Sequence, residues 1–296
     1  MKKKINILIT GSNGFLALNL AKKLKNKYNI YGIGRGSIKT KTEKRYYKIN
    51  FNKVINKKNL NKIKYLFDFV IHCAGSGLND SSKKNYTDNV QTTKDIIEFI
   101  EKKNKKTSLI FFSSLSVYGN KNKILHERIK IKPISNYAKN KLLAEKIIKD
   151  KKIKYVIIRS GPIFGPGLKK QFIFDACNKI SNNNSIFFSK PNFIRDWLYI
   201  NDVVKFVEKV LIHDFNKNLI LNLGSGKGHT LIDVINYIKK KLNNNKFQPI
   251  FNQKGISTNP KLMIANITQA KKLKWKPRVS FFKGLDRYLS WYKKNV

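Results

Sequence analysis

Short apolar runs alternate with amphipathic segments along the first half of the chain. A short apolar run predicts a buried strand, whereas apolar residues four positions apart, as at Leu16, Leu20 and Leu24, predict a helix. The predicted strands are 5–9, 29–34, 45–50, 67–73, 107–113 and 154–159, and the clearest further helices are 85–102 and 136–150. This alternation predicts an α/β fold, a doubly wound parallel sheet covered by helices on both faces.

The first predicted strand runs through a glycine turn into a helix. Gly11 permits the tight turn, Gly14 lets the backbone approach a pyrophosphate, and Ala17 is small enough for helix and strand to pack closely. The N-terminus of the helix then faces the phosphates. Because such a turn can also be purely structural, the motif favours a dinucleotide site without establishing one.

Tyr137 and Lys141 are four residues apart on the predicted helix 136–150, so they share one face of it. A neighbouring ammonium favours the phenolate and lowers the tyrosine pKa toward the range useful for acid/base chemistry at neutral pH. In a lysine-rich chain the same spacing also arises on solvated surfaces. The pair is therefore a candidate for catalysis with an ordinary alternative.

Composition excludes several classes of protein. The chain has 296 residues, of which 41% are hydrophobic, so a disordered tail protein is excluded. Cys73 and Cys177 form no CxxC pair and the histidines show no ligand spacing, so no metal site is predicted. No apolar run approaches the roughly 20 residues that span a bilayer, and we expect a cytoplasmic protein with no membrane partner.

The net charge is +45, from 62 Lys and Arg against 17 Asp and Glu. Such a charge is typical of proteins with polyanionic partners. The lysines are scattered along the chain with many Asn and Ile, however, and all three have AT-rich codons. Because a coding bias explains the charge equally well, nucleic-acid binding is not favoured, and the expected effect is an attraction for small anionic substrates.

Further segments follow the two motifs in a fixed order. They are His72-Cys73-Ala74-Gly75, Asn89-Val90, Ser113-Ser114-Leu115-Ser116-Val117-Tyr118-Gly119, Arg195-Asp196-Trp197, Asn222-Leu223-Gly224-Ser225-Gly226 and Trp275-Lys276-Pro277. With these segments the chain resembles, over nearly its whole length, the extended short-chain dehydrogenase/reductases, in their NAD(P)-dependent nucleotide-sugar epimerase/dehydratase/reductase branch.

The resemblance implies a Rossmann-like NAD(P)-binding domain at 1–164 and a smaller substrate-binding region at 165–296, with parts near 195–225 packing back on the core. It also implies a homodimer formed through the helices 85–102 and 136–150, and a nucleotide-sugar substrate. Tyr137 is implied to be the catalytic acid/base, Lys141 to tune it and hold the nicotinamide ribose, and Ser114 to bond the reacting sugar oxygen. Ser116 is implied to line the substrate site, with hydrogen bonding at the strand end, the favoured role for Ser113 and Ser116, as the alternative.

Three other polar residues are expected near this site. Arg195 resembles the residue that grips the nucleotide diphosphate, with a salt bridge to Asp196 or Asp202 as the alternative. Asn89 resembles an asparagine beside the active site, with a buried tie to the backbone as the alternative, and His72 is expected to be a satisfied core histidine. The implied cofactor contacts are Gly11, Asn13, Gly14, Phe15, Leu16, Arg35, Ala74, Gly75, Asn89, Tyr137 and Lys141.

Departures from the family narrow the expected chemistry. Leu115 and Ser116 stand where the 4,6-dehydratases carry an Asp-Glu pair, so dehydration is not expected. Ser116 is also not the Cys of the fucose-synthase type, and no His lies between Tyr137 and His213. What remains is hydride chemistry at one carbon. We expect a 4-ketoreductase acting on an NDP-(deoxy)sugar in surface-polysaccharide precursor synthesis, with an NDP-sugar 4-epimerase as the alternative and a non-catalytic RNA-binding or scaffold relative as the second.

The end of the second predicted strand bears on the cofactor. NAD-binding members usually place an acid there for the ribose 2′-hydroxyl, whereas an arginine accommodates a 2′-phosphate. Gly34 and Arg35 replace the acid. NADP(H) is therefore favoured over NAD(H), and NADPH in turn favours a net reductase over an epimerase.

Overall fold

The computed structural model describes residues 4–37, 42–51, 59–77, 82–213, 217–252 and 260–296. The chain forms two compact units, and each is built from three separate segments of the sequence. Unit 1 comprises 1–117, 135–159 and 208–221, and unit 2 comprises 118–134, 160–207 and 222–296. The two units are described separately below.

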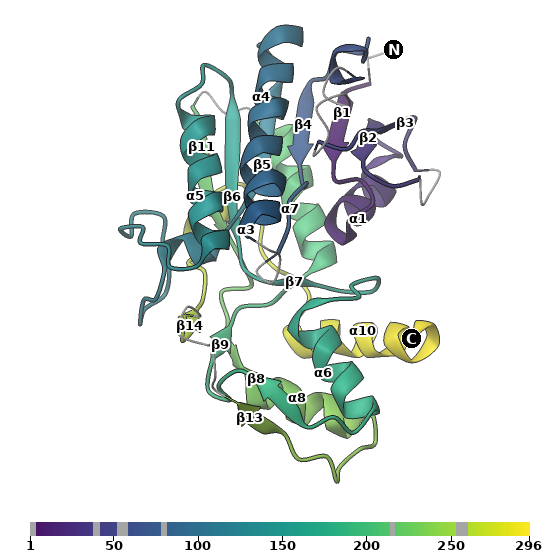
Figure 1. Cartoon of the computed structure of the whole chain (residues 1–296), viewed down its shortest axis with the longest axis vertical. Helices are drawn as coiled ribbons and strands as arrows, with labels where there is room; N and C mark the ends of the chain where they lie inside the picture. The colour runs from purple at the N-terminus through teal and green to yellow at the C-terminus, as the bar shows by residue number, and fades with distance from the viewer. Residues whose placement is uncertain (1–3, 38–41, 52–58, 78–81, 214–216, 253–259) are drawn as a thin grey trace. The chain divides into compact units, whose positions relative to one another are not determined.

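A seven-stranded sheet is the centre of unit 1, in the order β11-β6-β5-β4-β1-β2-β3 (Figure 1). Its strands are β1 (Asn6–Thr10), β2 (Asn29–Gly34), β3 (Arg45–Lys48), β4 (Phe69–His72), β5 (Ser108–Ser114), β6 (Tyr155–Ser160) and β11 (Leu219–Leu223). Leu8 of β1 is paired with Tyr31 of β2 on one side and with Val70 of β4 on the other, both in parallel register. This order is that of the Rossmann fold, and it confirms the predicted fold class.

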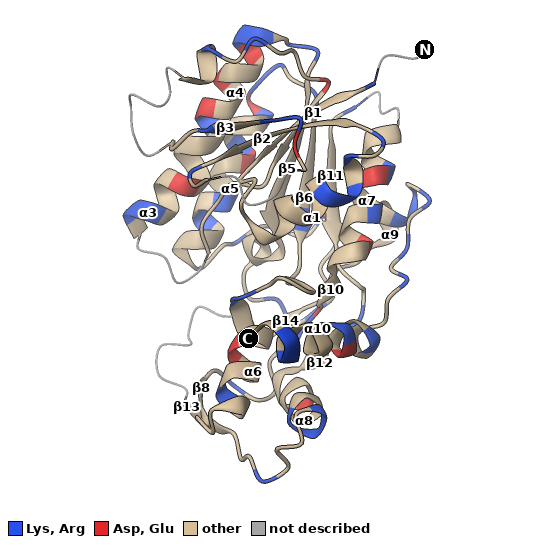
Figure 2. Cartoon of the chain, turned by 90° about the vertical axis from the view of Figure 1, so that its right-hand side faces the viewer, with Lys and Arg blue, Asp and Glu red and all other residues tan. Residues whose placement is uncertain are grey.

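Helices cover both faces of this sheet. α4 (Thr92–Lys103) and α5 (Asn136–Lys149) lie on one face and α1 (Phe15–Leu24) lies on the other (Figure 2). The core between them consists of apolar side chains of the central strands and the inward helix faces, among them Leu8, Ile33, Val70, Ile97, Leu109, Phe111, Ala144 and Ile157. The six strands predicted from apolar runs all form, and they differ from the prediction mainly by a residue or two at their ends.

The predicted helix 85–102 is not continuous. It consists of α3 (Ser82–Tyr86), a π-helix (Thr87–Gln91) and α4. The backbone N–H of Thr92 donates to the carbonyl of Thr87, five residues earlier, which defines the wider turn. Asp88, Asn89 and Val90 are consecutive and all buried, so this turn carries two buried polar side chains. π turns are often found at functional sites.

Unit 2 contains short strands and helices around aromatic residues. Trp197 stacks on Phe281 with ring centroids 5.2 Å apart, and Phe281 stacks on His229 at 4.5 Å. The carboxylate of Asp196 accepts hydrogen bonds from the backbone N–H groups of Ser225, Gly226 and Ala265. Its elements are β7 (Ile163–Phe164), α6 (Gln171–Ser181), β8 (Ile186–Phe188), β9 (Ile194–Arg195), β10 (Leu198–Tyr199), β12 (His229–Thr230), α8 (Leu231–Lys241), β13 (Ile250–Asn252), β14 (Leu262–Met263), α9 (Thr268–Lys271) and α10 (Phe281–Asn295). α7 (Ile200–Ile212) contributes residues to both units.

Lys and Arg lie on many elements of both units, with Asp and Glu among them (Figure 2). Within the described part of the chain, no helix combines the length and the apolar character that crossing a membrane requires.

Candidate active site

The glycine turn after β1 leaves room only for backbone. Gly11 has a φ of +67°, and a Cβ there would lie 2.9 Å from the backbone of Ala74. The N–H of Gly14 donates to the carbonyl of Gly11 at 2.7 Å, and α1 begins at Phe15 with no side-chain cap on its N-terminus. Open N–H groups at a helix start, beside a turn without side chains, fit a pyrophosphate. Leu16 lies in the same first turn of the helix and is partly buried.

Asn13 ties this turn to the segment after β2. Its Nδ2 donates to the carbonyl of Ser37 at 3.0 Å and to the hydroxyl of Tyr46 at 3.2 Å. Tyr46 in turn donates to the carbonyl of Gly36 at 2.6 Å. The structure thus gives Asn13 a role in holding two loops together at the cofactor side of the sheet.

The end of β4 meets the π-helix at Gly75. The side chain of Asn89 is fully buried, and its Nδ2 donates to the carbonyl of Asn85 at 2.9 Å and more weakly to that of Ser76 at 3.4 Å. Its Oδ1 has no partner among the described residues. A Cβ on Gly75 would lie 2.7 Å from that oxygen. The amide nitrogen of Asn89 is therefore hydrogen-bonded to the backbone, as the alternative role predicts. Its amide oxygen, without a partner among the described residues, lies beside Gly75, so a cofactor contact there also fits.

Ser114, Tyr137 and Lys141 come together in unit 1. Ser114 ends β5, while Tyr137 and Lys141 lie on the first turns of α5. The Oγ of Ser114 accepts hydrogen bonds from the N–H of Ser116 at 3.2 Å and from its hydroxyl at 2.9 Å. Because these two bonds fill both acceptor positions of the serine oxygen, its single proton is left to donate. The interaction of this hydroxyl with the phenol of Tyr137 lowers the tyrosine pKa.

The electrostatics of the pair differ from the expectation. Desolvation raises the pKa of Tyr137 above its ordinary value, despite the bond from Ser114. The ammonium of Lys141 donates to the carbonyl of Phe112 at 3.0 Å and lies 4.9 Å from the ring centroid of Phe111, while its distance to the Tyr137 ring centroid is 6.0 Å. Burial lowers the pKa of Lys141 to about 8. The prediction that this lysine lowers the phenol pKa was therefore wrong for the protein without ligands, because desolvation dominates for both groups.

A buried ion pair lies one helical turn beyond Lys141. Glu145, fully buried, accepts hydrogen bonds from Nη2 of Arg159 at 2.6 Å and from Nε at 3.0 Å. Ser113 donates to the same carboxylate at 2.5 Å. This network joins α5 to β5 and β6 directly behind the candidate catalytic groups. Sequence reasoning missed Glu145, although its place four residues after Lys141, on the same helix face, was a usable signal.

His72 is a core histidine, as predicted. Its Nδ1 lies 2.6 Å from the hydroxyl of Thr10, and its Nε2 lies 3.1 Å from that of Thr93. Burial, aided by the charge of Lys141, lowers the pKa of His72 to about 3. The imidazole ring of His72 therefore stays neutral in the folded protein down to about pH 3. In the unfolded chain the same ring takes up a proton as the pH falls below its ordinary pKa of 6.5.

We expect His72 to make the fold acid-sensitive. Between its unfolded and folded pKa values the unfolded chain binds more protons, so stability falls as the pH falls through that window. Relative to pH 7, this residue alone removes about 2 kcal/mol of unfolding free energy at pH 5. Urea unfolding at pH 7 and at pH 5 gives the fall in unfolding free energy between the two pH values. This fall should be smaller in His72→Gln than in the wild type by that amount. The same loss in both proteins would contradict the assignment.

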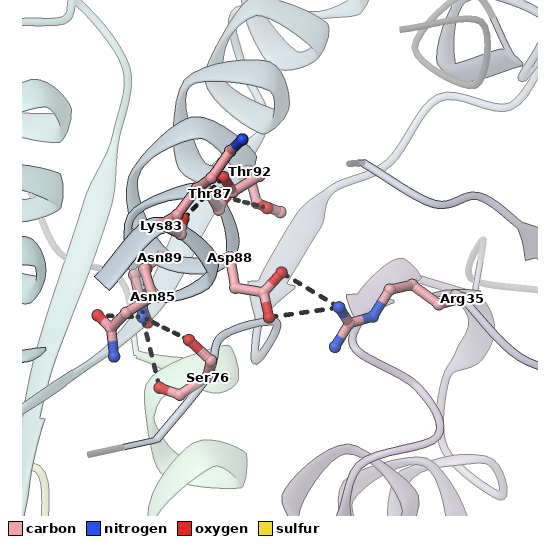
Figure 3. Close-up of polar contacts among 8 residues, drawn as sticks. All are labelled: Arg35, Ser76, Lys83, Asn85, Thr87, Asp88, Asn89 and Thr92. Atoms are coloured by element: carbon pink, nitrogen blue, oxygen red, sulfur yellow. Dashed lines mark hydrogen bonds and ion pairs between the residues drawn. The ribbon is translucent and has the colours of Figure 1, made fainter. Parts of the chain in front are cut away.

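The two candidate arginines lie in different units. Arg35 follows β2 in unit 1, and its Nη1 donates to both carboxylate oxygens of Asp88, at 3.2 and 3.3 Å (Figure 3). Arg195 lies on β9 in unit 2, where its Nη1 donates to the carbonyls of Ile194 and Lys261. Within the described part of the chain Arg195 pairs with no carboxylate, so the alternative of a salt bridge to a neighbouring aspartate is not what forms. Burial lowers the pKa of Arg195 to about 10.

The sequence and the fold both match known proteins. The model of the NAD dependent epimerase/dehydratase family matches residues 7–224. A UDP-glucuronate 4-epimerase of Thermodesulfobacterium geofontis is 27% identical, over 98% of this chain and 96% of its own. A UDP-glucuronic acid 4-epimerase from Bacillus cereus, solved with UDP-glucuronic acid and NAD, has a TM-score of 0.86 at 22% identity, covering 99% of this chain and 100% of its own.

A UDP-N-acetylglucosamine 4-epimerase from Methanobrevibacter ruminantium, solved with UDP-N-acetylmuramic acid, also has a TM-score of 0.86 at 22% identity, over 99% of this chain and 100% of its own. These structures share the fold of this chain, and the family model covers most of its length. With its glycine turn, its Rossmann sheet and its match over 7–224, the chain belongs to the NAD dependent epimerase/dehydratase family.

Proposed function

We propose that this protein is a nucleotide-sugar 4-epimerase acting on a UDP-sugar with a nicotinamide cofactor. The observation that carries the proposal is the placement of Ser114, at the carboxyl end of β5, beside Tyr137 on α5, where the serine lowers the pKa of the phenol. The names of the relatives support it, because those above are 4-epimerases of UDP-sugars. The 4-epimerase, given above as the alternative to a 4-ketoreductase, is thus the better supported of the two.

In this proposal the phenolate form of Tyr137 accepts the proton of the sugar 4-hydroxyl, and Ser114 donates a hydrogen bond to the same oxygen. A nicotinamide bound in unit 1 would supply the acceptor and donor of the C4 hydride, so that C4 could be re-reduced from its opposite face. Tyr137 then gives its proton back to the oxygen, so the sequence is redox-neutral and consumes no cofactor. Ser116, through its two bonds to the Ser114 oxygen, orients the serine proton toward the reacting oxygen.

The residues present fit the cofactor that this chemistry needs. Gly11 and Gly75 each lie where a side chain would meet neighbouring atoms closer than 3.0 Å, and the Oδ1 of Asn89 lies unpartnered beside Gly75. The start of α1 offers N–H groups to phosphates. Lys141 has three donors, one of which is bonded to the carbonyl of Phe112, and would hold a ribose hydroxyl.

Substrate contacts outside unit 1 are also part of the proposal. Arg195 would bind the diphosphate, because its guanidinium is partly buried and donates only to carbonyls among the described residues. Leu115 is fully buried where a dehydratase acid would be needed, which supports an enzyme that leaves C5 and C6 unchanged. A homodimer through the helices 85–102 and 136–150 and the preference for NADP(H) stay predictions.

Product analysis distinguishes the 4-epimerase from the 4-ketoreductase. UDP-glucose, UDP-glucuronic acid and UDP-N-acetylglucosamine are each incubated with the protein and a trace of NAD or NADP, and the products are identified by NMR. The proposal predicts the C4 epimer of at least one of them, with the cofactor unchanged at equilibrium. Stoichiometric oxidation of NADPH with a 4-keto sugar, and no epimer from any UDP-sugar, would restore the reductase.

A further inference from the structure

The Arg35–Asp88 ion pair spans the carboxyl edge of the central strand. Arg35 follows β2 and Asp88 lies on the π-helix after β4, while β1 lies between these two strands in the sheet. Figure 3 shows the two side chains extending toward each other from separate elements. In doubly wound sheets a dinucleotide binds in this crevice, outside the ends of the strands.

Two contacts relate the pair to that crevice. A Cβ on Gly36, next to Arg35, would lie 3.1 Å from the Nδ2 of Asn13 in the glycine turn. Asn89, next to Asp88, lies against Gly75 at the end of β4. Arg35 therefore lies at the end of β2, where the ribose 2′-substituent is recognised in this fold, and Asp88 reaches that place through its ion pair with Arg35.

The carboxylate is held firmly, whereas the guanidinium is accessible. The side chain of Asp88 is 6% exposed and that of Arg35 is 49% exposed. Asp88 lies within the π turn, where the hydroxyl of Thr92 donates to the carbonyl of Thr87 at 3.0 Å. Asp88 thus brings a fixed negative charge to a strand end whose own sequence, Gly34-Arg35-Gly36, has none.

We infer that Asp88 sets the choice between NAD(H) and NADP(H) by pairing with Arg35. A carboxylate accepts a hydrogen bond from a ribose 2′-hydroxyl and repels a 2′-phosphate, and here it also neutralises the arginine that would bind that phosphate. Asp88 acts as a positioning residue that disfavours NADP(H). Its carboxylate offsets the positive charge of Arg35, which stands at the end of β2 where NAD-binding members carry an acid. The inference rests on the proposed function only in that a nicotinamide cofactor binds unit 1.

The test measures cofactor selectivity and not turnover. Dissociation constants of NAD⁺ and NADP⁺ are measured by calorimetry for the wild type, Asp88→Asn, Arg35→Ala and the control Glu98→Gln. Glu98 is a suitable control because its charge lies on α4 in an exposed pair with Lys102. Asp88→Asn should shift the ratio of the two constants about tenfold or more toward NADP⁺, Arg35→Ala should shift it the opposite way, and the control should leave it unchanged.

Each other outcome counts against the inference. Equal weakening of both cofactors in Asp88→Asn would show a purely structural role, and an unchanged ratio would show no role; either overturns the inference and leaves the proposed epimerase standing. If Asp88→Asn fails to fold, as judged by circular dichroism, the half-exposed Arg35→Ala carries the test, and an unchanged ratio there overturns the inference. A wild type that binds neither cofactor overturns both proposals. A missing epimerase activity with a shifted ratio removes only the proposed substrate chemistry.

Discussion

Replacement of Tyr137 by phenylalanine is expected to lower kcat by about 10²–10⁴-fold, the usual range for losing a positioned acid/base group. The phenylalanine fills nearly the same space on α5 and removes only the hydroxyl that Ser114 contacts. The affinity for the cofactor should change little, because the glycine turn and Lys141 remain. Turnover of the UDP-sugar that the wild type converts is measured by NMR, and cofactor affinity by calorimetry.

A matched variant controls for the loss of a tyrosine hydroxyl in general. Tyr28 is also largely buried, and burial likewise raises its pKa, but it lies directly before β2, at the opposite edge of the sheet from the strand ends that form the site. Tyr28→Phe should therefore retain kcat. A Tyr137→Phe enzyme as active as Tyr28→Phe would remove Tyr137 from the mechanism.

Replacement of Glu145 by alanine is expected to destabilise the fold by about 3–5 kcal/mol. The carboxylate is fully buried and is bonded to Arg159 and Ser113, so its removal leaves a guanidinium charge in the core that lacks its carboxylate partner. Urea denaturation followed by circular dichroism gives the change. Because Glu145 also raises the pKa of Lys141, its loss lowers that pKa further.

The exposed pair of Glu98 and Lys102 on α4 serves as the comparison. Its two side chains are about 60% exposed, so Glu98→Ala should cost no more than about 1 kcal/mol. If Glu145→Ala were equally mild, the buried network behind the site would not be an important part of the fold.

The alternation of strands and helices in the doubly wound sheet could be predicted from the sequence, because apolar strand runs and amphipathic helices have different periods. The helical spacing of Tyr137 and Lys141 was visible for the same reason. The π turn at Thr87–Gln91 could not be predicted, since it depends on side chains such as Asp88 and Asn89 finding buried partners from distant segments. The same holds for the Arg35–Asp88 pair, whose members are 53 residues apart.

Electrostatic predictions from spacing failed where burial decides the result. The spacing of Tyr137 and Lys141 indicates a lowered phenol pKa, but both groups are desolvated and the ammonium is bonded to the carbonyl of Phe112. The sequence likewise shows Arg35 but not its carboxylate partner Asp88, while the preference for NADP(H) stays a prediction. Local sequence identifies such residues, while their protonation and charge depend on tertiary contacts.

The most direct test of the account follows the hydrogen on C4. A UDP-sugar that the enzyme converts is prepared with deuterium at C4, and its epimer is analysed by NMR and mass spectrometry in ordinary water. Hydride transfer to a bound nicotinamide and back predicts an epimer that keeps the deuterium at C4. An epimer that has lost the deuterium to solvent would contradict the account, because proton abstraction at carbon would then replace hydride transfer.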